Sequence, residues 1–122
     1  MRCVVSFFAL TVLCLPPAAQ AADVAAGKAI FDSTCSNCHS LAVGVNEVGP
    51  SLWHVVGRPS GTVPGYMDSD ALKALHIEWT PEALDAYLEK PRSDVHGAQM
   101  FFKGLPHEAD RANVIAYLES RQ

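Results

Sequence analysis

The chain has 122 residues, of which 49% are hydrophobic and 18% are charged, and its formal net charge at pH 7 is −4. This length fits one domain, and the acidic balance argues against nucleic acid or an anionic membrane surface as a partner. Neither a catalytic triad, nor a carboxylate pair, nor a phosphate-binding loop is present, so the pattern does not indicate an enzyme that breaks bonds.

The first 21 residues have the form of a secretory signal peptide. Arg2 precedes an apolar run, residues 3–15, that is too short to span a bilayer, and Ala19-Gln20-Ala21 matches a signal-peptidase site. Cleavage leaves a domain of residues 22–122 with net charge −5, because Arg2 is the only charged residue removed. We therefore expect a bacterial periplasmic protein without stable membrane insertion. A membrane anchor is the alternative if cleavage fails.

A first helix is expected after Asp23, a suitable N-cap, since Gly27, Ile30, Phe31 and Cys35 fall on one helical face. Such a helix delivers the most informative motif of the chain at its C-terminal end.

That motif is C-x-x-C-H, formed by Cys35, Cys38 and His39, which is the signature for covalent attachment of c-type haem. The two cysteines form thioethers with the haem vinyl groups, and the histidine binds the iron as proximal ligand. A redox dithiol is the alternative, but it is typical of a βαβ setting that this chain does not show. Cys3 and Cys14 lie in the leader, so no disulfide framework is expected. Haem would also enlarge an otherwise modest core.

A long connection follows the motif. Residues 41–65 contain five glycines and three prolines and predict a loop that wraps around something. Asp68 or Ser69 is suited to cap a short helix that reaches Leu75.

Two further helices complete an all-α chain. Thr80-Pro81-Glu82 combines a hydroxyl N-cap, a proline at the first helical position and an acid in the first turn, and Pro91 stops that helix. The last helix is expected from about Glu108 to Ser120. No segment predicts a sheet.

The second axial ligand decides whether a haem protein is a carrier or has an open site. Met67 and Met100 are the only methionines of residues 22–122. Each would by default be core filler, and His96 is a conceivable rival, so the residues alone leave this ligand open.

Taken together, the segments resemble class I cytochrome c, close to mitochondrial cytochrome c and its bacterial periplasmic relatives, over residues 23–120. The segments that carry the resemblance are the C-x-x-C-H motif, Gly49-Pro50-Ser51-Leu52, Gly57-Arg58, Trp79, Tyr87-Leu88-Glu89-Lys90-Pro91, and residues 97–104 around Met100.

The resemblance implies a class I cytochrome c fold around one covalent haem c, with its first and last helices crossing near Gly27, Phe31 and Tyr117. It implies that His39 and Met100 are the axial ligands of the iron. Several further residues gain roles from it. The carbonyl of Pro50 accepts a hydrogen bond from His39, Arg58 and Trp79 hold a haem propionate, Tyr87 hydrogen-bonds the methionine sulfur, and Phe102 packs over the haem near its exposed edge. Without the resemblance, Arg58 would be interpreted as a solvated surface charge, and Trp79 and Tyr87 would be interpreted as core aromatic residues.

The chain also departs from the family. Asp68 stands where many relatives have a tyrosine that contacts a propionate, and a carboxylate there would repel it. His96 replaces a proline. The lysine ring around the haem edge is mostly lost, with Arg92 still basic and neutral residues at Thr34, Ser93, Gln99, Pro106 and His107.

The sequence thus predicts a monomeric periplasmic carrier of single electrons between redox proteins, such as a dehydrogenase or respiratory complex and an oxidase. Two alternatives remain: a cytochrome subunit held in a dehydrogenase complex, and an open-site haem protein that binds small ligands.

Overall fold

The computed structural model describes residues 20–91 and 100–122, so most of the leader, residues 1–19, and residues 92–99, with Arg92 and His96, lie outside the described residues. The elements of the described part, in chain order, are α1 (Val24–Ile30), the π-helical turn η1 (Phe31–Cys35), α2 (Asp70–Leu75), α3 (Pro81–Glu89) and α5 (Glu108–Glu119). The β structure of this part is one isolated bridge between Pro59 and Glu78. The all-α prediction is confirmed. No helix of these two ranges is long and apolar enough to cross a membrane.

Side-chain caps set the beginnings of three helices where the sequence predicted them. Asp23, Ser69 and Thr80 each accept a hydrogen bond from a backbone N–H two or three residues further on, which satisfies a donor that the first helical turn leaves open. Of the two candidates for α2, Ser69 is therefore the cap. Helix α3 begins with Pro81 and ends at Glu89, just before Pro91.

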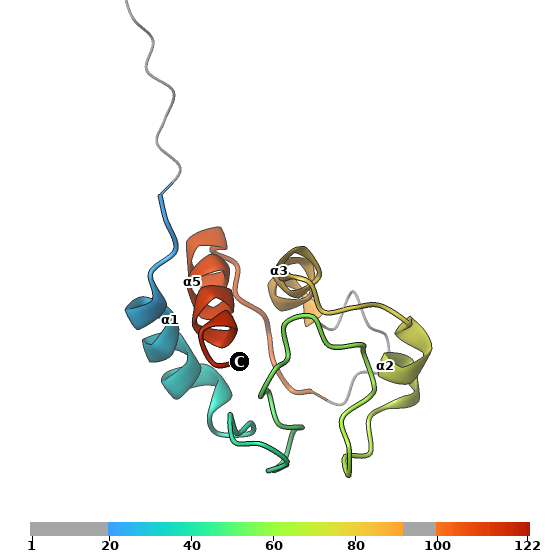
Figure 1. Ribbon diagram of the computed structural model, residues 1–122. Coiled ribbons are helices and arrows are strands. Elements are labelled where there is room, and N and C mark those ends of the chain that lie inside the picture. The colour runs from blue at the N-terminus through green and yellow to red at the C-terminus, as the bar shows by residue number, and fades with distance from the viewer. Residues whose placement is uncertain (1–19, 92–99) are drawn as a thin grey trace, which may run out of the picture.

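Helices α1 and α5 lie side by side, as Figure 1 shows, and pack closely where they cross. A Cβ on Gly27 would lie 1.9 Å from the carbonyl oxygen of Asn113, so this approach requires a glycine. The rings of Phe31 and Tyr117 meet next to it, with centroids 5.6 Å apart. The predicted crossing of the first and last helices is confirmed.

Helix α5 is also fixed to α3 and to the chain that precedes it. Arg111 is only 7% exposed. Its Nε donates to a carboxylate oxygen of Asp85 at 2.7 Å, and its Nη1 donates to the carbonyl oxygens of Leu105 and Pro106 at 2.9 and 3.1 Å. One buried guanidinium thus connects α5, α3 and the segment after Met100.

The loop predicted for residues 41–65 contains no helix, as expected. It is part of a longer connection, from residue 36 to residue 69, that runs between the α1–α5 pair and α2 (Figure 1). Near α2 the packing is close: a Cβ on Gly61, whose φ is +68°, would lie 2.8 Å from Cα of Lys73. The connection is therefore held against α2 at this point.

Candidate functional site

The cysteine motif follows a change of helical pitch. Helix α1 continues into the π turn η1, where the N–H of Ser36 donates to the carbonyl of Phe31, five residues back, at 2.9 Å. The N–H groups of Cys38 and His39 then both donate to the carbonyl of Cys35, at 3.1 and 3.0 Å. This tight turn brings the two thiols and the imidazole together at the end of one helix. π turns of this kind are frequent at functional sites.

The environment of the two cysteines argues against a redox dithiol. No disulfide joins Cys35 and Cys38, and burial raises the pKa of the Cys35 thiol to about 11. Redox-active cysteines depend on the opposite shift, a lowered pKa that supplies a thiolate. The alternative of a thioredoxin-like dithiol therefore finds no support in this environment.

His39 is oriented as an iron ligand would be. Its Nδ1 lies 2.8 Å from the carbonyl oxygen of Pro50, as the sequence predicted. Because a carbonyl only accepts, Nδ1 carries the proton and Nε2 carries the lone pair that can bind a metal. Burial lowers the pKa of His39, although the bond to Pro50 opposes this, so the neutral form that ligates metals is favoured. A Cβ on Gly49 would lie 2.3 Å from the ring, which explains the glycine before Pro50.

Arg58 and Trp79 come together through backbone pairing. The N–H of Trp79 donates to the carbonyl of Arg58 at 2.9 Å, and Trp79 is buried against the ring of Tyr87, with centroids 5.0 Å apart. The Nη1 of Arg58 donates to the carbonyl oxygens of Ser51 and Trp53, each at 3.0 Å. Its Nε is buried without a hydrogen-bond partner. The guanidinium thus keeps one buried donor that the residues of 20–91 and 100–122 do not satisfy, which calls for a further acceptor.

Asp68 is the second residue with such an atom. It is 6% exposed, and its Oδ2 is buried without a hydrogen-bond partner. Within residues 20–91 and 100–122, Arg58 Nε and Asp68 Oδ2 are the two buried side-chain polar atoms left unsatisfied. A c-type haem carries two propionate carboxylates, which fit the open donor of Arg58 directly. The same group fits Asp68 only if a proton lies between the two carboxyl groups.

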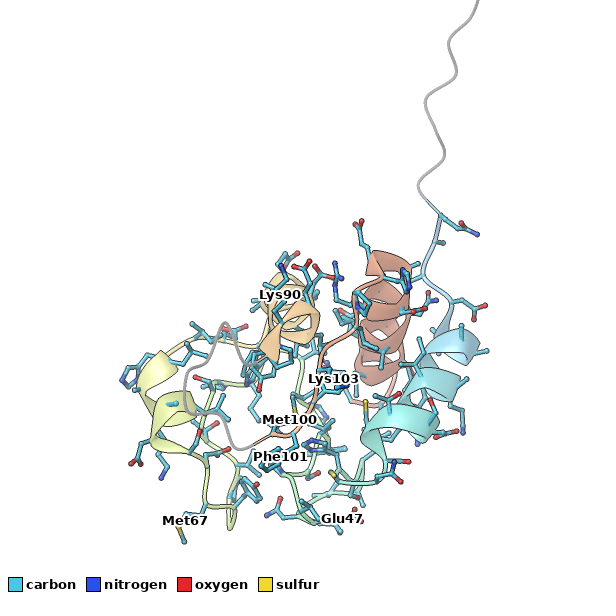
Figure 2. The ribbon with its side chains drawn as sticks, turned by 180° about the vertical axis from the view of Figure 1, so that it is seen from behind. Glu47, Met67, Lys90, Met100, Phe101 and Lys103 are labelled. Carbon is cyan, nitrogen blue, oxygen red and sulfur yellow. The ribbon has the colours of Figure 1, made fainter. Side chains whose placement is uncertain are left out.

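The two methionines differ in exposure. Met67 is 83% exposed and points outward at the edge of the molecule in Figure 2, whereas Met100 is half-buried and lies centrally. The chain after Met100 is fixed to the end of α3. The N–H of Leu105 donates to the carbonyl of Leu88 at 2.7 Å, and Gly104 has φ +100°, where a Cβ would lie 2.2 Å from a backbone oxygen. Met100 is thus the methionine with access to the interior.

The two phenylalanines after Met100 also differ. Phe101 is 93% exposed, while Phe102 is half-buried. Phe102 is the residue that the sequence placed over the haem. The exposed ring of Phe101 had no sequence signal, since a non-helical segment has no periodicity from which to assign faces.

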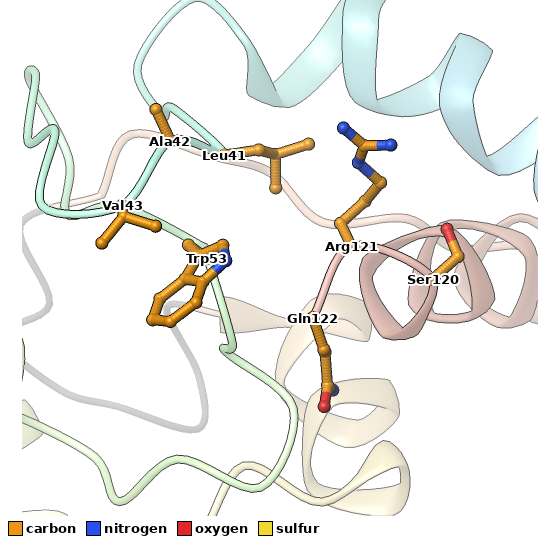
Figure 3. A pocket seen from close by; sticks show the side chains of 7 residues that line it. All are labelled: Leu41, Ala42, Val43, Trp53, Ser120, Arg121 and Gln122. Atoms are coloured by element: carbon orange, nitrogen blue, oxygen red, sulfur yellow. The ribbon is translucent and has the colours of Figure 1, made fainter.

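A surface pocket of about 380 Å³ lies elsewhere, between the start of the long connection and the C-terminus (Figure 3). Leu41, Val43, Trp53 and Arg121 are among the residues that line it. None of the predicted site residues lines this pocket, so it plays no part in the argument for haem.

The geometry has counterparts in known proteins. The family model described as Cytochrome c matches residues 24–122. The chain belongs to the cytochrome c family. It is 49% identical over 104 residues to the cytochrome c-type cyt cy of Rhodobacter capsulatus, covering 85% of this chain and 52% of that protein, so it spans about half the length of that relative. It is 46% identical to cytochrome c2 of Rhodopila globiformis and 45% identical to cytochrome c of Euglena viridis, each over 98 residues that make up 80% of this chain and 92% and 96% of the relative.

A solved structure agrees. Cytochrome cH from Methylobacterium extorquens matches with a TM-score of 0.76 and 37% identity, over 80% of this chain and 98% of that one. The class I cytochrome c fold is therefore confirmed. As a member of the cytochrome c family, the protein carries one covalently bound c-type haem with its iron and acts as an electron carrier rather than as an enzyme.

Proposed function

We propose that this cytochrome c is a periplasmic one-electron carrier whose haem iron is held by His39 and Met100. The haem supplies a reversible change between ferrous and ferric iron. The observation that carries the proposal is the 2.8 Å contact between His39 Nδ1 and the Pro50 carbonyl oxygen, which presents Nε2 to a metal next to the two cysteines. Such a bond fixes the ring orientation of a ligating histidine.

The surrounding residues have distinct roles in this proposal. Cys35 and Cys38 hold the haem covalently, and a thioether ligand from Met100 raises the potential by favouring ferrous iron. Trp79 and Tyr87, which pack on each other, contribute polar tips to a propionate and to the methionine sulfur. Phe102, half-buried, covers the haem near its edge and excludes water. A dry pocket further disfavours the extra positive charge of ferric iron.

The methionine ligand is tested by a matched pair of variants, Met100→Ala and Met67→Ala, in the holoprotein. The ferric wild type should show the weak red absorption of an iron–sulfur bond. Met100→Ala should abolish that band and open the site to exogenous imidazole, while Met67→Ala should leave it unchanged because Met67 is 83% exposed. A band that survives in Met100→Ala and disappears in Met67→Ala would reverse the assignment.

The location and partners follow from the leader and from charge. The apolar run and Ala19-Gln20-Ala21 support export to the periplasm. A monomer of residues 22–122 with net charge −5 would exchange electrons with a periplasmic dehydrogenase or respiratory complex and an oxidase. Thr34, Pro106 and His107 are neutral and exposed at positions of the family's basic ring, which favours docking by apolar contact near Phe102 over docking by a ring of lysines.

A further inference from the structure

Asp68 carries a carboxyl group in a buried environment, where the ionised form of a side chain is unfavourable. It is 94% buried, given its exposure of 6%, and one of its oxygens has no hydrogen-bond partner. A buried ionised carboxylate without partners is strongly disfavoured, and such a group binds a proton or finds a counter-charge. Asp68 therefore requires a proton or a further hydrogen-bonding group, which the side chains described around it do not provide.

Arg58 does not meet this requirement alone. It lies within electrostatic range of Asp68 and also of His39, yet no ion pair joins Arg58 to Asp68 within residues 20–91 and 100–122. Its Nε is unsatisfied as well. Arg58 Nε and Asp68 Oδ2 are thus two buried, unsatisfied polar atoms on side chains within electrostatic range of each other, and they indicate a third polar group that serves both. The bound haem supplies one, because each propionate is a carboxylate that accepts from a guanidinium.

We propose that Asp68 and a haem propionate share a proton-binding site that couples proton uptake to reduction of the iron. The proposal rests on the haem being held as described above. Arg58 compensates one of the two carboxylates, and a proton compensates the other. When a redox partner delivers one electron and ferric iron becomes ferrous, the carboxyl pair takes up one proton from water. Oxidation returns the electron to a partner and the proton to water, and no covalent bond of the haem changes.

The sign of the coupling follows from the charge at the iron. Reduction removes one positive charge near the pair, so the protonated form is favoured more strongly in the ferrous protein than in the ferric protein. The reduction equilibrium constant therefore falls as pH rises through the pair's transition, and it is level on either side. Over that transition we expect a total fall of about tenfold, which corresponds to ~59 mV for one electron. The transition belongs to the pair and not to Asp68 alone.

The other ionisable groups near Asp68 do not account for the proposed proton uptake. Arg58 stays protonated at all relevant pH values. On α2, Asp70 and Lys73 pair with each other at 3.8 Å with exposed side chains, and Tyr66 donates its hydroxyl to the carbonyl of Val48 at 2.9 Å. Asp70 thus offers a matched control, since it is an exposed carboxylate two residues from the buried one.

The test is a spectroelectrochemical titration of the holoprotein against pH in three forms: wild type, Asp68→Asn and Asp70→Asn. Wild type and Asp70→Asn should show the fall in the reduction equilibrium constant, and Asp68→Asn should be level over the same range. A level wild-type profile, or the same transition in Asp68→Asn, would overturn the proposal. If Asp68→Asn does not fold, infrared difference spectra of the wild type decide: the carbonyl stretch of a protonated carboxyl should strengthen on reduction, and its absence refutes the shared proton.

The haem spectrum keeps this test separate from that of the proposed function. Loss of covalent haem or of the iron–sulfur band in the wild type would contradict the haem site itself. Normal haem spectra with a level pH profile would contradict only the shared proton.

Discussion

The two sides of the molecule are built differently. The helical half, which we define as α1, η1, α3 and α5, is held together by contacts of the chain with itself, such as the Gly27 approach and the Arg111–Asp85 pair. The loop half, residues 40–79 with α2, contains both unsatisfied buried polar atoms and both non-glycine residues with positive φ, His54 and His76, among the described residues. The helical half satisfies its buried polar groups with residues of the chain itself. The loop half leaves two buried polar atoms for the haem to satisfy.

The largest effect should come from removing the haem attachment. In a Cys35→Ala/Cys38→Ala variant made without haem, the loop half should lose protection of its backbone amides against hydrogen exchange, because nothing fills the space it surrounds. Cooperative unfolding should disappear, which means a loss of most of the ~5–15 kcal/mol typical of a domain. Helices α1 and α5 should retain more protection than the loop half, since their contact needs no haem.

Two results would contradict this account. One is a cooperative unfolding transition in the haem-free double variant, with amides of residues 40–79 protected as in the holoprotein. The other is release of haem from the wild-type polypeptide by acid–acetone extraction, which thioether bonds resist.

A smaller effect is expected at the helix crossing. Gly27→Leu in the holoprotein should lower the free energy of unfolding by about 3 kcal/mol, because even its Cβ would overlap the Asn113 carbonyl. The matched control is Ala29→Leu, which adds its side chain at an exposed position of α1 and should change stability by less than about 0.5 kcal/mol. Denaturant unfolding measures both. Equal effects would mean that the crossing does not stabilise the helical half as described.

The helical half was the more predictable one, and the reasons are local. Asp23 and Thr80 cap helices through hydrogen bonds within three residues, so the sequence contains their complete signal. The π turn before Cys35 could not be predicted, because the apolar spacing from Gly27 to Cys35 is equally typical of a continuous α-helix.

The loop half depends on contacts between distant segments, which the sequence does not display. Asp68 was recognisable as a departure from the family, but its burial results from the fold and had no local signal. The resemblance assigned Arg58 and Trp79 to a haem propionate, but their backbone pairing was not predicted, since no rule of spacing joins positions 21 residues apart. Residues that contact a cofactor are the hardest to assign from sequence, because the cofactor that determines their positions is not part of the sequence.

The smallest expected effect concerns electrostatic docking. The exposed residues Thr34, Pro106 and His107 bear no fixed positive charge, and the net charge of residues 22–122 is −5. Electron transfer to an acidic partner should therefore show no loss of rate as salt is added, since salt screens repulsion and the screening length is only ~10 Å at 0.1 M. Stopped-flow mixing across a salt series measures this. A fast reaction at low salt that collapses on adding salt would contradict it.

A double variant, Thr34→Lys/His107→Lys, sharpens this last test by returning two charges to the helical half, one next to Cys35 in η1 and one at the start of α5. With an acidic partner, its rate at low salt should rise on the order of threefold over the wild type, and the gain should vanish at high salt, because steering by charge acts only over the screening length. If the added lysines leave the rate unchanged at every salt concentration, partners dock away from this face.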